Sequence, residues 1–124
     1  MKWLSGVAQS FSHAWRGLRL AFVSERSFRI QTAAALVVIL FVIVLPFRSW
    51  ERLLLLVATG AVLVLELINS TVERLVDLFK PRLHAYAKDI KDLMAAAVLV
   101  AAAFALAIGV LILWPYLGSA FNSL

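Results

Sequence analysis

Two uncharged apolar runs constrain what this chain can fold into more than any other feature. Residues 30–47 carry no charge over 18 positions, and residues 93–117 carry none over 25. About 20 apolar residues in a helix cross a hydrocarbon core about 30 Å thick. Because 64% of the 124 residues are hydrophobic and only 15% are charged, a small soluble core cannot bury this apolar surface. The sequence predicts an all-α membrane protein, with residues 1–124 forming a single membrane domain.

A third apolar run is shorter and ends in polar residues. Residues 53–65 are 13 in number, and they make only about 20 Å of helix at 1.5 Å per residue. To cross a membrane, the helix must continue past Glu66 and Asn69. We therefore expect a third span over residues 53–72, with Glu66 about 9 Å inside one membrane surface.

The first 29 residues differ from the spans. They contain no long apolar run after Lys2, so a signal peptide is not predicted. Apolar residues recur there every three or four positions, at Leu4, Val7, Phe11, Trp15, Leu18 and Phe22. This spacing predicts an amphipathic helix over 1–29 that lies flat on the membrane surface. Packing of the same helix against the spans is a second possibility, and both can hold at once.

The distribution of lysine and arginine predicts the orientation. Residues 1–29 contain five of these residues, residues 73–92 five more, the loop 48–52 two, and the chain after Trp114 none. Because cytoplasmic loops are enriched in positive charge, the N-terminus and the 73–92 loop are predicted to be cytoplasmic. The net charge of +5 then reflects topology, and we expect no nucleic-acid partner. The chain has no cysteine, so its redox compartment is not indicated.

Four polar residues share one face of the predicted third span. At 100° per residue, Glu66, Asn69, Glu73 and Asp77 fall within about 80° of arc. An ionisable residue within a span is costly and indicates a function. Two bland alternatives are that Glu66 only bridges helices in an oligomer and that Asp77 is simply solvated.

Further charges lie on the same predicted cytoplasmic side. Lys88, Lys91 and Asp92 precede the 93–117 span, and Glu25 stands among arginines near the end of the N-terminal helix. Carboxylates with a lysine suit a divalent cation and phosphate. The bland alternatives are topology for the lysines and a surface ion pair for Glu25. No GxxxxGK[ST] loop and no glycine-rich kinase loop is present. The residues alone therefore indicate a polar site at the cytoplasmic membrane face.

The segment "ELINSTVERLVDL" resembles the E-x-x-N-[ST]-x-x-E-x-x-x-D signature of the small bacterial integral-membrane diacylglycerol kinases and of their relatives, the undecaprenol kinases. The resemblance continues in "WRGLRLAFVSERSFRIQ" and "KDLMAAAVLVAA" and covers about residues 10–112. It implies a homotrimer in the bacterial inner membrane, with a surface helix and three spans per chain. It also implies transfer of the γ-phosphoryl group of MgATP to a lipid hydroxyl.

The resemblance implies a role for each matching residue. Glu66 matches the general base, Glu25 and Glu73 match the Mg²⁺ ligands, and Asn69 and Asp77 match residues that orient the site. The ATP-binding set also comprises Glu25, Glu73, Arg82, Leu83, His84, Lys91 and Asp92. The lipid-binding set comprises Arg19, Ala21, Phe22, Ser27, Phe28, Arg29, Ile30, Gln31, Glu66 and Ala95. The family's spacing favours Lys91 over Lys88 as the lysine on the phosphates.

The chain departs from the family pattern in two places. Leu93, Met94 and Ala95 stand where relatives often have glycine, and His13 stands where an aromatic residue often borders the adenine.

Three other functions compete with diacylglycerol phosphorylation. "NST" after Glu66 and "AAAV" in the 93–117 span favour diacylglycerol as the acceptor, with undecaprenol as the alternative. A small proton-coupled transporter also uses one intramembrane glutamate, but that function leaves Glu73, Asp77, Lys91 and Asp92 unexplained. A membrane adaptor is a third possibility.

Overall fold

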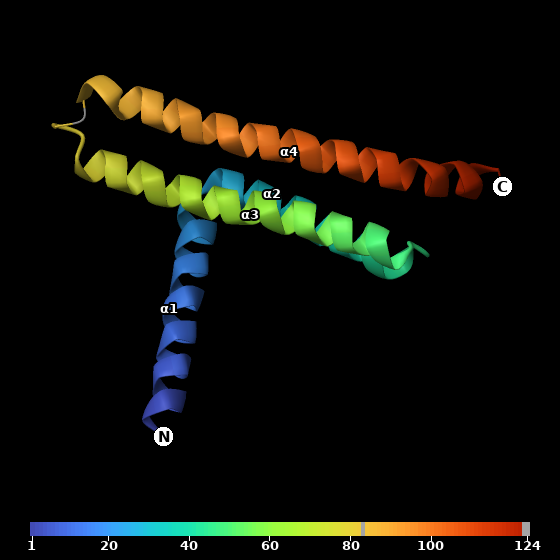
Figure 1. The fold of residues 1–124 in the computed structure, drawn as a ribbon, viewed down its shortest axis with the longest axis horizontal. Coiled ribbons are helices and arrows are strands. Elements are labelled where there is room, and N and C mark those ends of the chain that lie inside the picture. Colours follow the sequence, from blue (N-terminus) through green and yellow to red (C-terminus); the bar gives the residue numbers. More distant parts are fainter. Residues whose placement is uncertain (83, 123–124) are drawn as a thin grey trace.

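Three long helices run side by side, and a fourth joins them at one point and projects away at a steep angle (Figure 1). The computed structural model describes residues 1–82 and 84–122. Its helices are α1 (Lys2–Ser24), α2 (Arg26–Val44), α3 (Ser49–Leu78) and α4 (His84–Phe121). The last three are long and apolar enough to cross a membrane, and the described ranges contain no strand. The predicted all-α fold with three spans is confirmed.

Two short breaks set the bounds of α1 and α2. Glu25 is extended, with φ −109° and ψ 112°, so the chain turns there and the segment 26–29 belongs to α2. The N-terminal helix is therefore shorter than the predicted range 1–29. Leu45 is also extended, with φ −87° and ψ 147°, because a residue that precedes proline disfavours the helical conformation. This explains why α2 ends at Val44 and not at residue 47.

The helices that contain the other two expected spans extend beyond them. The helix expected over 53–72 covers Ser49–Leu78, and the helix expected over 93–117 covers His84–Phe121. At 1.5 Å per residue, α2 is about 28 Å long and α3 about 45 Å. Helix α2 has just the length of a hydrocarbon core. The α3–α4 hairpin is longer, and it extends well beyond the start of α2. Figure 1 shows this hairpin reaching past the point where α1 joins α2.

The packing core lies at the end of the bundle opposite the α3–α4 turn. Phe47, Leu55 and Ile112 form a buried cluster, and the Tyr116 ring meets Phe47 edge-on, with 4.7 Å between the ring centroids. The Tyr116 hydroxyl donates to the buried Glu51 carboxylate at the start of α3. These contacts attach the C-terminal part of α4 to the α2–α3 connection.

The remaining apolar surface of the bundle faces outward, as shown by Leu36, Leu99 and Leu106, which are 62%, 71% and 69% exposed. Lipid or a neighbouring chain has to cover such a surface.

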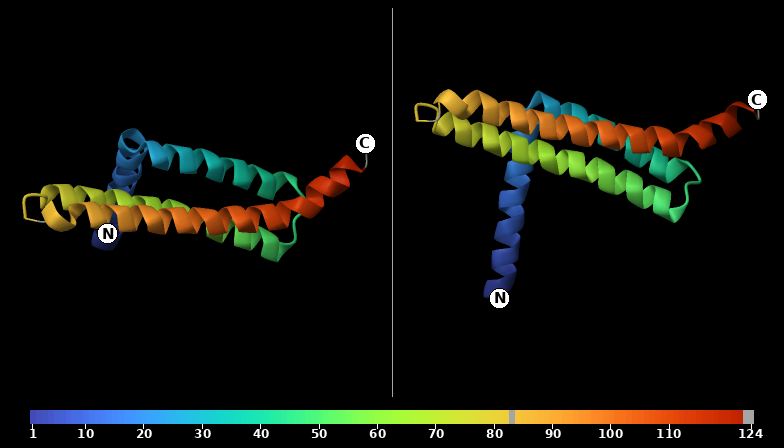
Figure 2. Two further views of the ribbon diagram at one scale, coloured as in Figure 1. Left: turned by 90° about the horizontal axis from the view of Figure 1, so that it is seen from above. Right: turned by 45° about the horizontal axis from the view of Figure 1, so that its top comes forward.

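Helix α4 contains Pro115, and it bends towards its C-terminal end (Figure 2). Proline removes a helical hydrogen bond and clashes with the preceding turn, which accounts for the bend.

Candidate active site

Glu66 is buried where α3 passes the first turn of α2. Glu66 is only 3% exposed, and Ser27 Oγ donates a hydrogen bond to Glu66 Oε2 at 3.0 Å. Ser27 is the second residue of α2. Because α2 is just long enough to span the hydrocarbon core, this contact places the Glu66 carboxylate at the edge of the membrane.

Asn69 and Glu73 form a pair one turn further along α3. Asn69 Nδ2 donates to Glu73 Oε1 at 3.4 Å. Asn69 Oδ1 is buried and has no hydrogen-bond partner among the described residues. Buried polar atoms are normally paired, so Asn69 holds Glu73 on one side and offers an unused acceptor on the other.

Arg74 connects the α1–α2 junction to α3. Arg74 Nη2 donates to Ser24 Oγ at 2.8 Å and lies 3.7 Å from Glu25 Oε1. Glu25 thereby lies near α3, next to Arg74, which directly follows Glu73 in the sequence. Sequence reasoning missed Arg74, because it lies about 100° around the helix from Glu73 and its partners belong to a different helix.

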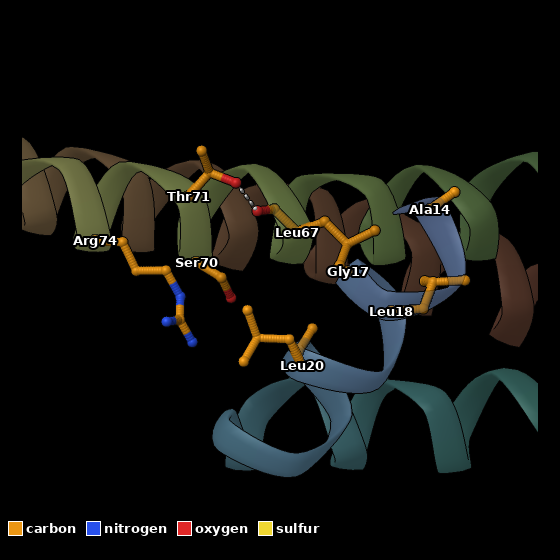
Figure 3. Close-up of a pocket in the computed structure, with 9 residues that line it drawn as sticks. Ala14, Gly17, Leu18, Leu20, Leu67, Ser70, Thr71 and Arg74 are labelled. Carbon is orange, nitrogen blue, oxygen red and sulfur yellow. Dashed lines mark hydrogen bonds between the residues drawn. The ribbon is translucent and has the colours of Figure 1, made fainter. Parts of the chain in front are cut away.

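A groove of about 530 Å³ runs between α1 and α3. Figure 3 shows Arg74 and Ala14 near its opposite ends, with Ser70 and Leu20 between them. The residues that line it are Ala14, Gly17, Leu18, Leu20, Ala21, Leu67, Ser70, Thr71 and Arg74. The walls are largely apolar and one end carries a guanidinium group, so the groove is suited to an amphiphilic molecule.

The two candidate phosphate lysines are held differently. Lys91 Nζ lies 2.6 Å from Asp77 Oδ1 on α3, whereas Lys88 Nζ lies 2.8 Å from Asp92 Oδ2 on its own helix. The Lys91 side chain is 34% exposed and that of Lys88 is 85% exposed. Lys91 is therefore the lysine that faces α3, about one turn beyond Glu73, whereas Lys88 faces outward.

The Lys91–Asp77 pair stays charged at neutral pH. Its hydrogen bond lowers the pKa of the Asp77 carboxyl below its ordinary value and raises the pKa of the Lys91 ammonium. Both residues lie beyond the expected spans 53–72 and 93–117. The end of the hairpin at the α3–α4 turn therefore carries a cation next to the Glu73 carboxylate, and the charge of Glu73 also raises the pKa of Lys91.

The other expected nucleotide residues lie at the α3–α4 turn. Arg82 is exposed in the turn, and His84 is exposed at the first position of α4. Leu83 lies outside the described residues. Within residues 1–82 and 84–122, neither Arg82 nor His84 forms a side-chain hydrogen bond or ion pair with Lys91.

Most of the expected lipid-binding residues gather at the α1–α2 junction. Ala21 and Phe28 are buried there. Arg29 Nη1 donates to the carbonyl oxygens of Phe22 and Val23, at 3.0 and 2.9 Å, and so ties the end of α1 to α2. Exposed members of the set are Arg19, Phe22, Ser27, Ile30 and, on α4, Ala95, while Gln31 is half-buried.

The candidate metal ligands provide part of a coordination shell. The described part of the chain has no group of three or more histidine, aspartate or glutamate side chains able to hold a metal ion by themselves. Mg²⁺ is commonly held by one or two carboxylates, with phosphates and waters completing its shell. Glu25, which lies 3.7 Å from Arg74, and Glu73, which precedes Arg74 in α3, are carboxylates of the kind that this pattern needs as partial ligands.

The helices and the site together define an integral membrane protein with a polar site at the membrane edge. Its buried carboxylate, Glu66, lies against the first turn of α2, Glu25 lies at the α1–α2 junction, and Asp77 and Lys91 lie further along the α3–α4 hairpin. A sequence model of prokaryotic diacylglycerol kinases matches residues 12–113, and this chain belongs to that family.

The curated relatives match nearly the whole chain. Diacylglycerol kinase of Escherichia coli (strain K12) is 30% identical over 112 residues, which are 90% of this chain and 92% of that protein. Undecaprenol kinase of Bacillus subtilis (strain 168) is 39% identical over 116 residues, 92% of this chain and 93% of that one. Diacylglycerol kinase of Synechocystis sp. (strain ATCC 27184 / PCC 6803 / Kazusa) is 38% identical over 107 residues, 86% of this chain and 61% of that protein. The family is one of kinases, which sets the transporter and adaptor hypotheses aside.

Proposed function

We propose that this chain transfers the γ-phosphoryl group of ATP to the hydroxyl of diacylglycerol and so forms phosphatidic acid. The observation that carries the proposal is Glu66, a carboxylate buried against the first turn of α2 at the membrane edge. Glu73 lies seven residues further along α3, about 10 Å towards the end of the hairpin. A lipid acceptor stays in the membrane and ATP stays in the water, so a shared site needs groups at both depths.

In the proposed mechanism, Glu66 accepts the proton of the lipid hydroxyl while the hydroxyl oxygen attacks the γ-phosphorus. Glu25 and Glu73 would hold Mg²⁺, which would neutralise charge on the phosphates when bound. Asn69 fixes the Glu73 carboxylate through its hydrogen bond, and Lys91 offers its ammonium group to the phosphates. Asp77 holds Lys91 beside Glu73 until the nucleotide binds. Arg82, Leu83, His84 and Asp92 complete the proposed nucleotide contacts.

We place the protein in the bacterial inner membrane, with the N-terminus and the α3–α4 turn in the cytoplasm. The excess of lysine and arginine in residues 1–29 and 73–92, ten against two in the loop 48–52, supports this orientation. Helix α1 then lies on the inner surface with its exposed apolar residues, such as Trp3, Phe11 and Trp15, in the lipid. The proposed assembly is a homotrimer.

Undecaprenol is the second candidate acceptor. The identity of 39% to undecaprenol kinase of Bacillus subtilis over 92% of this chain favours it. The reaction and the roles of Glu66 and Glu73 are the same for both lipids, so the choice between them concerns only the lipid-facing residues.

An acceptor assay tests the proposal directly. The purified full chain in detergent micelles receives ATP and Mg²⁺ with diacylglycerol, with undecaprenol, or with neither lipid. ADP release and the phosphorylated lipid are both measured. We expect diacylglycerol to be phosphorylated faster than undecaprenol. The reverse order would correct the acceptor, and a folded protein that phosphorylates neither lipid would contradict the kinase proposal.

A further inference from the structure

Among the serine and threonine hydroxyls that form hydrogen bonds in the described residues, the Ser27 hydroxyl has a different kind of partner. Among the described residues, seven other serine and threonine hydroxyls donate to a carbonyl oxygen of their own helix, three or four positions earlier. Ser27 Oγ donates instead to the side chain of Glu66, 39 residues away on α3. The hydroxyl therefore makes a contact between helices and none with its own backbone.

The break between α1 and α2 explains this difference. The carbonyl groups three and four positions before Ser27 belong to Ser24 and Val23, at the end of α1. The chain is extended at Glu25, and the Val23 oxygen already accepts a hydrogen bond from Arg29 Nη1. Ser27 therefore has no carbonyl of its own helix to bond, and its hydroxyl is available to α3.

The hydroxyl fixes how the Glu66 carboxylate is oriented. Within residues 1–82 and 84–122, Ser27 is the only side chain that donates a hydrogen bond to Glu66. A buried carboxylate needs such a donor, because it has lost its water. With Oε2 held by Ser27, Oε1 is the oxygen left to accept a further proton or hydrogen bond.

We infer that Ser27 is a positioning residue for the general base of the lipid kinase reaction, an inference that rests on the proposed function. Its hydroxyl holds Oε2 of Glu66 so that Oε1 faces the hydroxyl of the acceptor. In the step, the acceptor oxygen bonds to the γ-phosphorus and the bond between that phosphorus and the ADP oxygen breaks. The acceptor's proton moves to Oε1, and Ser27 keeps its own proton throughout. Ser27 thus acts through Glu66 and touches neither the nucleotide nor the transferred group.

Removing the hydroxyl tests this role. Ser27→Ala is expected to lower kcat about tenfold, the scale of a lost hydrogen bond to a charged group. The KM values for ATP and for the lipid should stay unchanged, because in this role Ser27 acts through Glu66 and not, as the family resemblance implies, through contact with the lipid. Ser27→Thr keeps the hydroxyl and should restore most of the rate. Thr59→Val is the matched control, because it removes a hydroxyl from within the bundle that bonds only its own helix, and it should leave kcat unaltered.

Two results would overturn the positioning role. A raised lipid KM with unchanged kcat would mean that Ser27 contacts the lipid and does not orient the base. If Ser27→Ala lowers both kcat and the melting temperature, and Ser27→Thr restores neither, then Ser27 has a structural role only.

A double variant separates this inference from the proposed function. If Ser27 acts only through Glu66, then adding Ser27→Ala to a Glu66→Gln protein should lower kcat no further. If the two substitutions instead lower kcat independently, so that their effects multiply, the inference is overturned. A Glu66→Gln protein with normal turnover would instead overturn the base itself. A slow Glu66→Gln protein beside a fully active Ser27→Ala protein would remove the positioning role and leave the proposed function standing.

Discussion

At the scale of single residues, Glu66 and Glu73 are the same residue type on one helix but have different surroundings. Glu66 is buried against Ser27, whereas Glu73 is half-exposed and accepts a hydrogen bond from Asn69. A buried carboxylate suits proton transfer with a lipid, and a more accessible carboxylate suits a hydrated cation. Their separate proposed roles follow from this difference.

The proposed metal role of Glu73 predicts a response to Mg²⁺. Glu73→Gln removes a charged oxygen ligand but keeps the size of the side chain, so activity should fall sharply and high Mg²⁺ should restore part of it. The measurement is turnover as a function of Mg²⁺ concentration. Near-normal turnover of this variant at low Mg²⁺ would contradict the assignment.

The two lysines at the foot of α4 provide a matched pair of variants. Lys91→Ala should raise the KM for ATP and lower turnover, because it removes a charge that stabilises the transferring phosphates. Lys88→Ala should change little, since Lys88 pairs only with Asp92 on its own helix and is largely exposed. Steady-state kinetics with varied ATP measure both effects. The opposite pattern would show that the phosphate lysine lies one turn earlier on α4.

Some of the site can be predicted from the sequence and some cannot, for a physical reason. The helical period predicts that Glu66, Asn69 and Glu73 share a face, because this depends only on positions along one helix. The contacts of Glu66 with Ser27 and of Arg74 with Ser24 join residues 39 and 50 positions apart. Such contacts depend on how helices pack, and no local pattern in the sequence encodes that.

At the scale of helices, the interior of each span was easier to predict than its ends. The apolar runs predict α2, α3 and α4, because a helix that is buried in lipid requires an apolar sequence. The ends depend on local backbone choices, such as the extended conformation at Glu25, where no proline or glycine marks the break. The polar extensions of α3 to Leu78 and of α4 from His84 were missed, because a helix that has left the membrane no longer needs an apolar sequence.

Tyr116 attaches α4 to the start of α3 and predicts a change in stability without a change in chemistry. Tyr116→Phe keeps the edge-on contact with Phe47 but removes the hydrogen bond to the buried Glu51. Leaving a buried carboxylate without this donor should lower the melting temperature. Turnover at low temperature should stay normal, because the contact lies at the opposite end of the bundle from Glu66. Ser119→Ala is the control, since Ser119 bonds only the Tyr116 carbonyl, and an equal melting temperature for both variants would refute this role.

At the scale of the whole molecule, one chain leaves its site partly uncovered. Arg74 and Asp77 are exposed, and Glu25 and Glu73 are only half-buried. Lys91 pairs at the level of Asp77, 11 residues and about 16 Å along α3 from Glu66. We propose that neighbouring chains complete the site in the trimer.

Completion by neighbouring chains predicts complementation. Glu66→Gln chains mixed with Lys91→Ala chains should regain activity above that of either variant alone, because some sites then combine an intact Glu66 with an intact Lys91. The activity of co-reconstituted mixtures measures this, with each variant diluted by itself as the control. No gain in oligomers shown to be mixed would place the whole site within one chain.

The central claim is that Glu66 is the base for a lipid hydroxyl at the membrane edge, and Glu66→Gln tests it most directly. The amide keeps the shape of the side chain but cannot accept the proton, so turnover should fall by about 10² to 10⁴. The affinity for ATP should barely change, because the proposed role of Glu66 is towards the lipid hydroxyl and not towards the nucleotide. The melting temperature should stay the same or rise, because an uncharged amide is cheaper to bury than a carboxylate. Lipid phosphorylation, nucleotide affinity and melting temperature are measured on the same two proteins. A Glu66→Gln protein that phosphorylates lipid at the normal rate would contradict the account.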